Sequence, residues 1–265
     1  MIPPEIRSLV DALQPIKVYL PNIVLIGGWV PLLNKIYNPS YNFDGAPVLT
    51  KDVDIACPQT LPVKEEAVDE LLMKSGFKSQ LLGSDKPPIC KYINDSGVEL
   101  EFLTPMKGSG SASNVNVQGG LSAQSLRYLE ILLEHTVFIE ITEVDLKIQT
   151  PELTAFLYQK GLSFPLRNSE LKKAKDLYYI YQVLDSADLE NLVQNIKRKI
   201  FPGHPSPWVK TFINNLTSQF GKIDSIGVDS VFRQLKDLPE YRGDEPFEKM
   251  KIFGTVSEFI GRLKT

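Results

Sequence analysis

The sequence predicts an α/β protein in which a mixed-sheet domain, residues 1–150, precedes an all-helical domain, residues 151–265. In the first half, segments with helical spacing of apolar residues alternate with short β-branched runs. The run Asn94-Asp95-Ser96-Gly97 is typical of a hairpin turn, so part of the sheet should be antiparallel. After residue 150 the apolar spacing is helical throughout, which places the domain boundary there.

The composition is that of an ordinary globular protein. The chain has 265 residues, of which 43% are apolar and 23% charged, and its net charge is −3. These values exclude collagen-like, low-complexity and coiled-coil chains. Cys57 and Cys90 could form at most one disulfide, so we expect a reduced, cytoplasmic protein. No apolar run has the length of a signal-peptide core at the start or of a bilayer span elsewhere, so we expect neither export nor a membrane partner.

The charge is unevenly distributed along the chain. Residues 1–150 hold 12 basic and 18 acidic side chains, a balance of −6, whereas residues 151–265 hold 17 and 14, a balance of +3. An acidic half beside a basic half permits an anionic ligand between them. The overall charge of −3 makes RNA a weaker candidate partner, because phosphate contacts normally recruit many Lys and Arg side chains.

The N-terminal elements are expected in the order helix, strand, turn, helix and strand. Residues 5–13 have apolar side chains at helical spacing, and residues 23–26 have the β-branching of a buried strand. Gly27-Gly28 then punctuates the chain before the next helix. After a Pro- and Asn-containing connection, Val53, Ile55 and their neighbours form a second short strand that ends at Pro58.

The remaining elements complete the sheet and build the helical half. Residues 62–75 predict a helix, and residues 107–120, rich in Gly, Ser and Asn, predict a mobile loop. We expect strands over residues 77–82, 89–93 and 98–103, with 137–141 and 144–148 as further strands of the same sheet. We expect helices over residues 153–160, 171–184, 189–200, 208–220, 228–235 and 247–263.

Two carboxylates lie two residues apart on one predicted strand. Because side chains alternate along a strand, Asp52 and Asp54 face one side while Val53 points into the core. Like charges held close together repel, and a divalent cation such as Mg²⁺ normally neutralises such a pair. A third carboxylate on a neighbouring strand would permit a two-metal site. Glu99 and Glu101 have the same parity on their strand, and parity alone does not choose between them.

Each of these features also has a purely structural interpretation. Asp-x-Asp is common in surface turns, and a Gly-Gly pair is typical of a plain turn. A helix that begins after Gly27-Gly28 would nevertheless direct backbone N–H groups and a positive dipole end toward an anion. The features together favour a functional site more strongly than any one of them does. Their order along the chain is strand, Gly-Gly, helix, strand with paired acids, hairpin and acidic strand.

Three motifs follow one another along the first half of the chain. They are Leu25-Ile26-Gly27-Gly28-Trp29, Thr50-Lys51-Asp52-Val53-Asp54-Ile55 and Leu100-Glu101-Phe102-Leu103-Thr104-Pro105. Together they resemble the motifs of the DNA polymerase β-like nucleotidyltransferase superfamily. Within it, the chain is most similar to the bacterial minimal nucleotidyltransferase-like families that include abortive-infection toxins.

The resemblance implies a magnesium-dependent nucleotidyltransferase. It implies that Asp52 and Asp54 hold Mg²⁺, and that Glu101 completes a two-metal site or accepts the proton of the acceptor. Gly27 and Gly28 would approach the phosphates of a nucleoside triphosphate. An acceptor hydroxyl would attack the α-phosphorus and release pyrophosphate. The acceptor is open between an RNA end, a protein hydroxyl and a small molecule, and the toxin resemblance implies a cognate antitoxin-like protein.

In the helical half, the resembling families carry a Lys and a later Lys-Asp, here Lys160 and Lys175-Asp176. The resemblance implies that Lys160 meets the triphosphate, and that Asp176 orients a lysine or helps with the acceptor. Lys160 could equally favour the C-terminal dipole of its helix, and Asp176 could pair with Lys172 one turn away.

Two residues depart from the family pattern. Many members have Ser or Thr where this chain has Trp29, and Asp where it has Glu101. These departures leave an alternative function, a catalytically degenerate protein that keeps the fold and binds a nucleotide or a partner as a regulator.

Overall fold

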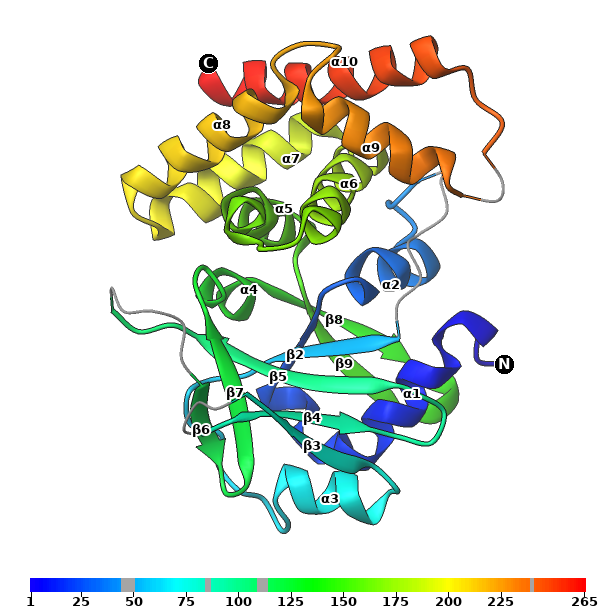
Figure 1. The fold of residues 1–265 in the computed structure, drawn as a ribbon, viewed down its shortest axis with the longest axis vertical. Coiled ribbons are helices and arrows are strands. Elements are labelled where there is room, and N and C mark those ends of the chain that lie inside the picture. The colour runs from blue at the N-terminus through cyan, green and yellow to red at the C-terminus, as the bar shows by residue number, and fades with distance from the viewer. Residues whose placement is uncertain (44–50, 84–86, 109–113, 239–240) are drawn as a thin grey trace. The chain divides into compact units, whose positions relative to one another are not determined.

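The computed structural model of the protein describes residues 1–43, 51–83, 87–108, 114–238 and 241–265 (Figure 1). These residues divide into two compact units. The first unit comprises residues 1–33 and 51–152, and the second comprises residues 34–43 and 153–265. The helical part of the second unit thus begins at residue 153, two residues later than the expected 151, and the unit also includes a short segment from the first half of the chain.

Within the described residues, seven strands of the first unit form one mixed sheet. Its path runs through β1 (Val24–Ile26), β2 (Asp52–Ala56), β5 (Glu99–Pro105), β4 (Ile89–Ile93) and β3 (Lys78–Leu82), while β7 (Leu121–Leu126) pairs with β5 and with β6 (Asn114–Gln118). β5 is parallel to β2 and to β7, and the other pairings are antiparallel. The expected mixed α/β fold is therefore confirmed.

The strands form where apolar residues alternate with polar ones. On β2, Val53 and Ile55 are fully buried, whereas Asp52 is exposed and Asp54 is half-buried. The turn between β4 and β5 forms as expected, with Gly97 at a positive φ of 75°. The fold thus buries one face of β2 in the core and leaves its acidic face toward solvent.

Helices of the first unit pack against the sheet and against each other. They are α1 (Arg7–Leu13), α3 (Val68–Lys74) and the short α4 (Glu130–Glu134), while α2 (Trp29–Tyr37) begins in this unit. A 3-10 segment, Gln14–Asn22, follows α1, and its Tyr19 hydroxyl donates a hydrogen bond of 2.6 Å to the Glu66 carbonyl. The helix expected over residues 62–75 begins later, at Val68, and the chain before it has no regular structure. The Leu61 N–H donates to the Val117 carbonyl of β6.

The expected place of residues 137–141 and 144–148 in the main sheet is wrong. They form β8 (Thr136–Ile141) and β9 (Leu146–Pro151), which pair with each other as a separate antiparallel hairpin. Asp145 closes this hairpin in the left-handed conformation, with φ of 51°. The connection is so short that the two runs become antiparallel neighbours.

Residues 114–118, expected to belong to a mobile loop, form β6 instead, and residues 109–113 lie outside the described part of the chain. The polar composition is misleading here because Gln118 is buried with its amide satisfied. Its Oε1 accepts from the Val68 N–H at 2.8 Å, and its Nε2 donates to the Pro62 carbonyl at 3.0 Å and to the Tyr19 hydroxyl at 3.2 Å. One buried side chain therefore joins β6, α3 and the segment after α1.

The described part of the second unit is helical, and each of the six expected helical segments is confirmed. The helices are α5 (Leu153–Ser163), α6 (Glu170–Ser186), α7 (Leu189–Asn195, continued as a π-helix to Ile200), α8 (Ser206–Phe220), α9 (Ile226–Lys236) and α10 (Glu245–Lys264) (Figure 1). Aromatic side chains fill the core, with the rings of Tyr158 and Phe212 5.0 Å apart. None of the helices among the described residues has the length and apolarity that crossing a bilayer requires.

The Gln118 contacts predict a loss of stability when the amide is removed. Gln118→Leu leaves the buried Val68 N–H without its partner and also removes the bond to the Pro62 carbonyl, so the free energy of unfolding should fall by about 2 kcal/mol or more. Chemical denaturation followed by circular dichroism measures the change. Asn116→Leu, at an exposed position of the same strand, is the matched control and should have little effect. Equal effects of the two substitutions would contradict a structural role for the Gln118 amide.

Candidate active site

The pairing of β2 with β5 gathers four carboxylates on one face of the sheet. In this parallel pair, Asp52 lies opposite Glu99 and Asp54 lies opposite Glu101. Residues opposite one another in neighbouring strands point to the same face. Asp52 is exposed and the other three are half-buried, so ligands in solvent can reach them. We call these four residues the acid group; it brings Asp52, Asp54 and Glu101 together, as expected from the sequence.

The turn after β1 lies directly against the acid group. β1 pairs with β2 so that Ile26 lies opposite Asp54. Gly27 follows with a φ of +73°, and a Cβ atom at this position would overlap Asp54 Oδ2. The backbone angle therefore favours glycine, and a side chain here would displace the Asp54 carboxylate. Gly28 is buried, and α2 begins at the next residue.

Trp29, which replaces the Ser or Thr of the resembling families, has a defined structural role. Its side chain is 2% exposed, and its Nε1–H donates a hydrogen bond of 2.9 Å to the backbone carbonyl of Asp52. The indole thus fixes the beginning of β2 relative to the start of α2. This contact holds the backbone that carries the first aspartate of the acid group.

Lys91 is a site residue that the sequence analysis missed. Its Nζ lies 2.5 Å from Glu101 Oε1 and 3.1 Å from Glu99 Oε2. Burial by itself lowers the pKa of Lys91, but hydrogen bonds and the negative charges of Glu101 and Glu99 outweigh it, so the pKa is raised and the ammonium stays charged. The alternation along residues 89–93 indicates the face of Lys91, but only the β4–β5 register identifies its partners.

In the second unit, the structure brings Lys160 and Asp176 together. Lys160 Nζ lies 2.6 Å from Asp176 Oδ1, and the side chains are 6% and 4% exposed. Arg167, which the sequence analysis missed, donates from Nε to Asp176 Oδ2 at 2.8 Å. The partners of Asp176 are thus these two cations from before α6, whereas the sequence also allowed Lys172, and a role of Asp176 at the nucleotide or the acceptor stays a prediction. Contact of Lys160 with a triphosphate stays a prediction.

The environment of Asp176 keeps it ionised. Burial raises its pKa, but the charges of Lys160 and Arg167 and their hydrogen bonds outweigh this effect, and the pKa of Asp176 is lowered below its usual range. Lys160 Nζ also lies 5.6 Å from the centroids of the Phe156 and Tyr179 rings. The pair is therefore an integral part of the core of the helical unit.

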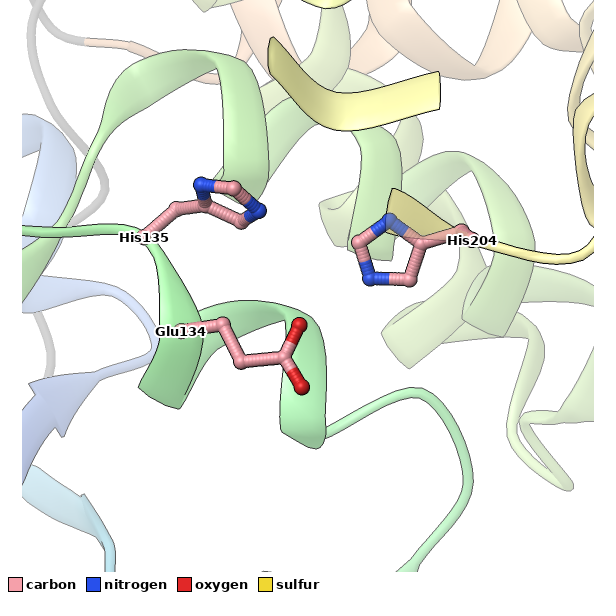
Figure 2. A group of neighbouring side chains, drawn as sticks. All are labelled: Glu134, His135 and His204. Atoms are coloured by element: carbon pink, nitrogen blue, oxygen red, sulfur yellow. The ribbon is translucent and has the colours of Figure 1, made fainter. Parts of the chain in front are cut away.

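Figure 2 shows three other side chains of metal-binding type. Glu134 ends α4 and His135 follows it in the first unit, whereas His204 follows the 3-10 turn Phe201–Gly203 in the second. His204 Nδ1 lies 2.7 Å from the Ile200 carbonyl oxygen, and its ring stacks on Trp208. Glu134 and His135 thus belong to one unit of the chain and His204 to the other.

The acid group fits a divalent cation of the magnesium type. Mg²⁺ prefers carboxylate oxygens and usually binds to one or two of them together with water and phosphate. Asp52 and Asp54 offer such oxygens on one strand face, and the absence of a Cβ atom at Gly27 leaves Asp54 Oδ2 its place. Glu101 is less available, because Lys91 already binds one of its oxygens.

Comparisons with known proteins identify the family. A family model described as nucleotidyltransferase matches residues 5–199. A search of curated proteins finds no match. A solved structure of an antigenic nucleotidyltransferase-like protein from Paracoccidioides brasiliensis has 17% identity and a TM-score of 0.38, with 77% of this chain and 92% of that chain covered. A solved structure of a Bradyrhizobium diazoefficiens CD-NTase in complex with GTP has 9% identity and a TM-score of 0.27, with 100% of this chain and 88% of that chain covered.

The Gly27 geometry predicts a local effect of substitution. Gly27→Ala combines a left-handed backbone angle, which costs about 1–2 kcal/mol for a residue with a Cβ atom, with a clash against Asp54 Oδ2. Gly76→Ala is the matched control, because Gly76 has a φ of +89° and open space around it. Denaturation curves should therefore show a larger loss of stability for Gly27→Ala. Equal losses would mean that Asp54 does not pack against the turn.

The buried charge pair predicts a large effect in the second unit. Asp176→Asn leaves Lys160 buried without its counter-charge and should lower the free energy of unfolding by about 3–5 kcal/mol. Glu258→Gln removes a surface partner of Arg262 and should cost less than about 1 kcal/mol. Chemical denaturation near neutral pH compares the two variants. A small effect of Asp176→Asn would contradict the paired arrangement.

The same pair predicts a dependence of stability on pH. Because the pKa of Asp176 is lowered in the folded state, its contribution is complete above the ordinary aspartate pKa of 3.8 and is lost as the pH falls through the folded value. Denaturation of the wild type and of Asp176→Asn from neutral to acidic pH measures this contribution. The stability difference between them should shrink on acidification; a constant difference would contradict the lowered pKa.

Proposed function

Because the chain belongs to the nucleotidyltransferase family, we propose that it moves a nucleoside monophosphate from a nucleoside triphosphate to an acceptor hydroxyl with the help of Mg²⁺. The main support is the parallel register that sets Asp54 opposite Glu101, with Asp52 on the same face and Gly27 against Asp54. Carboxylates from two strands beside a strand-to-helix turn suit phosphoryl chemistry, because the turn can meet phosphates where the acids bind the cation.

Each part of the site has a proposed task. Asp52 and Asp54 would hold Mg²⁺, which when bound supplies positive charge to the phosphoryl oxygens. The backbone of Gly27 and Gly28, at the start of α2, would approach the phosphates. Trp29 keeps the Asp52 end of β2 in place through the bond to its carbonyl. These groups position the reactants, and positioning provides much of the acceleration in phosphoryl transfer.

The proposed reaction balances without a further reactant. The acceptor oxygen forms a bond to the α-phosphorus, the bond from this phosphorus to the bridging oxygen of the β-phosphate breaks, and pyrophosphate leaves. The hydroxyl proton passes to a carboxylate of the acid group, for which Glu101 is the proposed acceptor. The acceptor class, whether an RNA end, a protein hydroxyl or a small molecule, and an antitoxin-like partner stay predictions, as does the contact of Lys160 with the triphosphate.

Two observations favour a second function, that of a catalytically degenerate regulator. Lys91 occupies an oxygen of Glu101 that an active centre would use, and Trp29 replaces a hydroxyl side chain. Such a protein would bind a nucleotide or a partner without releasing pyrophosphate. Pyrophosphate release therefore separates the two functions.

The catalytic proposal predicts that transfer depends on the two aspartates. With ATP, CTP, GTP or UTP labelled at the α-phosphate, Mg²⁺ and candidate acceptors, the wild type should label an acceptor and release pyrophosphate. Asp52→Asn and Asp54→Asn should reduce both to background, because each removes a charged ligand of the cation. Asp95→Asn, in an exposed surface pair with Lys78, is the control and should stay active.

Thermal melting supplies a second readout. A nucleotide that binds the folded protein raises its melting temperature, and this rise should require Mg²⁺ and both aspartates. A rise that is independent of Mg²⁺, with no pyrophosphate released, would select the regulator. If none of the four nucleotides at millimolar concentration changed the melting temperature or labelled an acceptor, the catalytic proposal would be wrong.

A further inference from the structure

Lys91 is placed among the acids by the sheet itself. β4 and β5 are antiparallel, and Lys91 lies directly opposite Glu101. Its neighbours Cys90 and Tyr92 are buried, so the lysine points to the opposite face, which it shares with Glu99 and Glu101. The register of β4 against β5 therefore fixes the position of Lys91 beside Glu101.

The ammonium of Lys91 bridges two carboxylates of the same strand. Glu99 and Glu101 are two residues apart on β5, and the distances of 3.1 Å and 2.5 Å join each of them to Nζ. The side chain of Lys91 is 25% exposed, less than that of an ordinary surface lysine. In this arrangement Lys91 supplies the positive charge that a cation bound at Glu101 would otherwise supply.

Lys91 competes with any second ion for Glu101, because its ammonium already lies 2.5 Å from Glu101 Oε1. A second ion on Glu101 would have to displace the ammonium or lie a few Å from it, where like charges repel strongly.

We propose that Lys91 is the built-in counter-ion of Glu101 and that the acid group holds one divalent ion, at Asp52 and Asp54, in place of the two expected from three converging acids. This inference rests on the proposed function, because it concerns the same cation site. Lys91 acts as a positioning residue: it keeps Glu101 beside the cation without letting it become a ligand.

Manganese binding tests the inference without any substrate. Mn²⁺ is titrated into the metal-free protein, and the free ion is measured by electron paramagnetic resonance. The wild type should bind one ion per chain, and Lys91→Met should bind two, because Glu101 is released to a second ion. Lys91→Arg keeps the charge and should bind one. Lys78→Met, on neighbouring β3 and paired with exposed Asp95, is the matched control and should also bind one.

A second variant keeps the inference testable if Lys91→Met does not fold. Glu101→Gln should still bind one Mn²⁺, because Glu101 is bonded to Lys91 and is not a metal ligand. Loss of the ion in Glu101→Gln would overturn the inference, as would two ions in the wild type, none in the wild type, or one in a folded Lys91→Met variant. Absence of nucleotide transfer with these ion counts intact would overturn the proposed enzyme and leave the role of Lys91 standing.

Discussion

The parallel register of β2 against β5 is the constraint on which the site depends. Because side chains alternate along a strand, a slip of one residue would turn Asp54 into the core and Val53 out of it. The buried face prevents this slip, since Val53, Ile55 and Leu100 are fully buried beneath the acids. Apolar burial on one face of the sheet thus positions the charges on the other face.

The two units use charged residues in opposite ways. In the sheet, the residues of the acid group are exposed or half-buried, so cations from solution can neutralise their charges. In the helical unit, Asp176 and Lys160 neutralise each other out of contact with water, and Arg167 satisfies the second carboxylate oxygen. A buried carboxylate with a partner on each oxygen helps to define how its core packs. A group of accessible carboxylates can still bind a cation.

The sequence predicts those parts of the protein that depend on local pattern. Alternation places Asp52 and Asp54 on one face, and helical spacing locates all six helices of the second unit. Pattern fails where a distant partner decides the outcome: Gln118 forms part of a strand because Val68 and Pro62 satisfy its amide. Lys91 and Arg167 were missed for the same reason, because only the register of β4 and the fold of the helices reveal their partners.

The assignment of the acid group as a cation site can be tested most directly by locating the ion. Crystals grown with Mn²⁺ and measured at a wavelength where manganese scatters anomalously would show its position without reference to any activity. A cation site at the acid group predicts an anomalous peak within coordination distance of the carboxylates of Asp52 and Asp54, beside the Gly27 turn. A peak elsewhere on the first unit, or none with the acid group fully ordered, would contradict it.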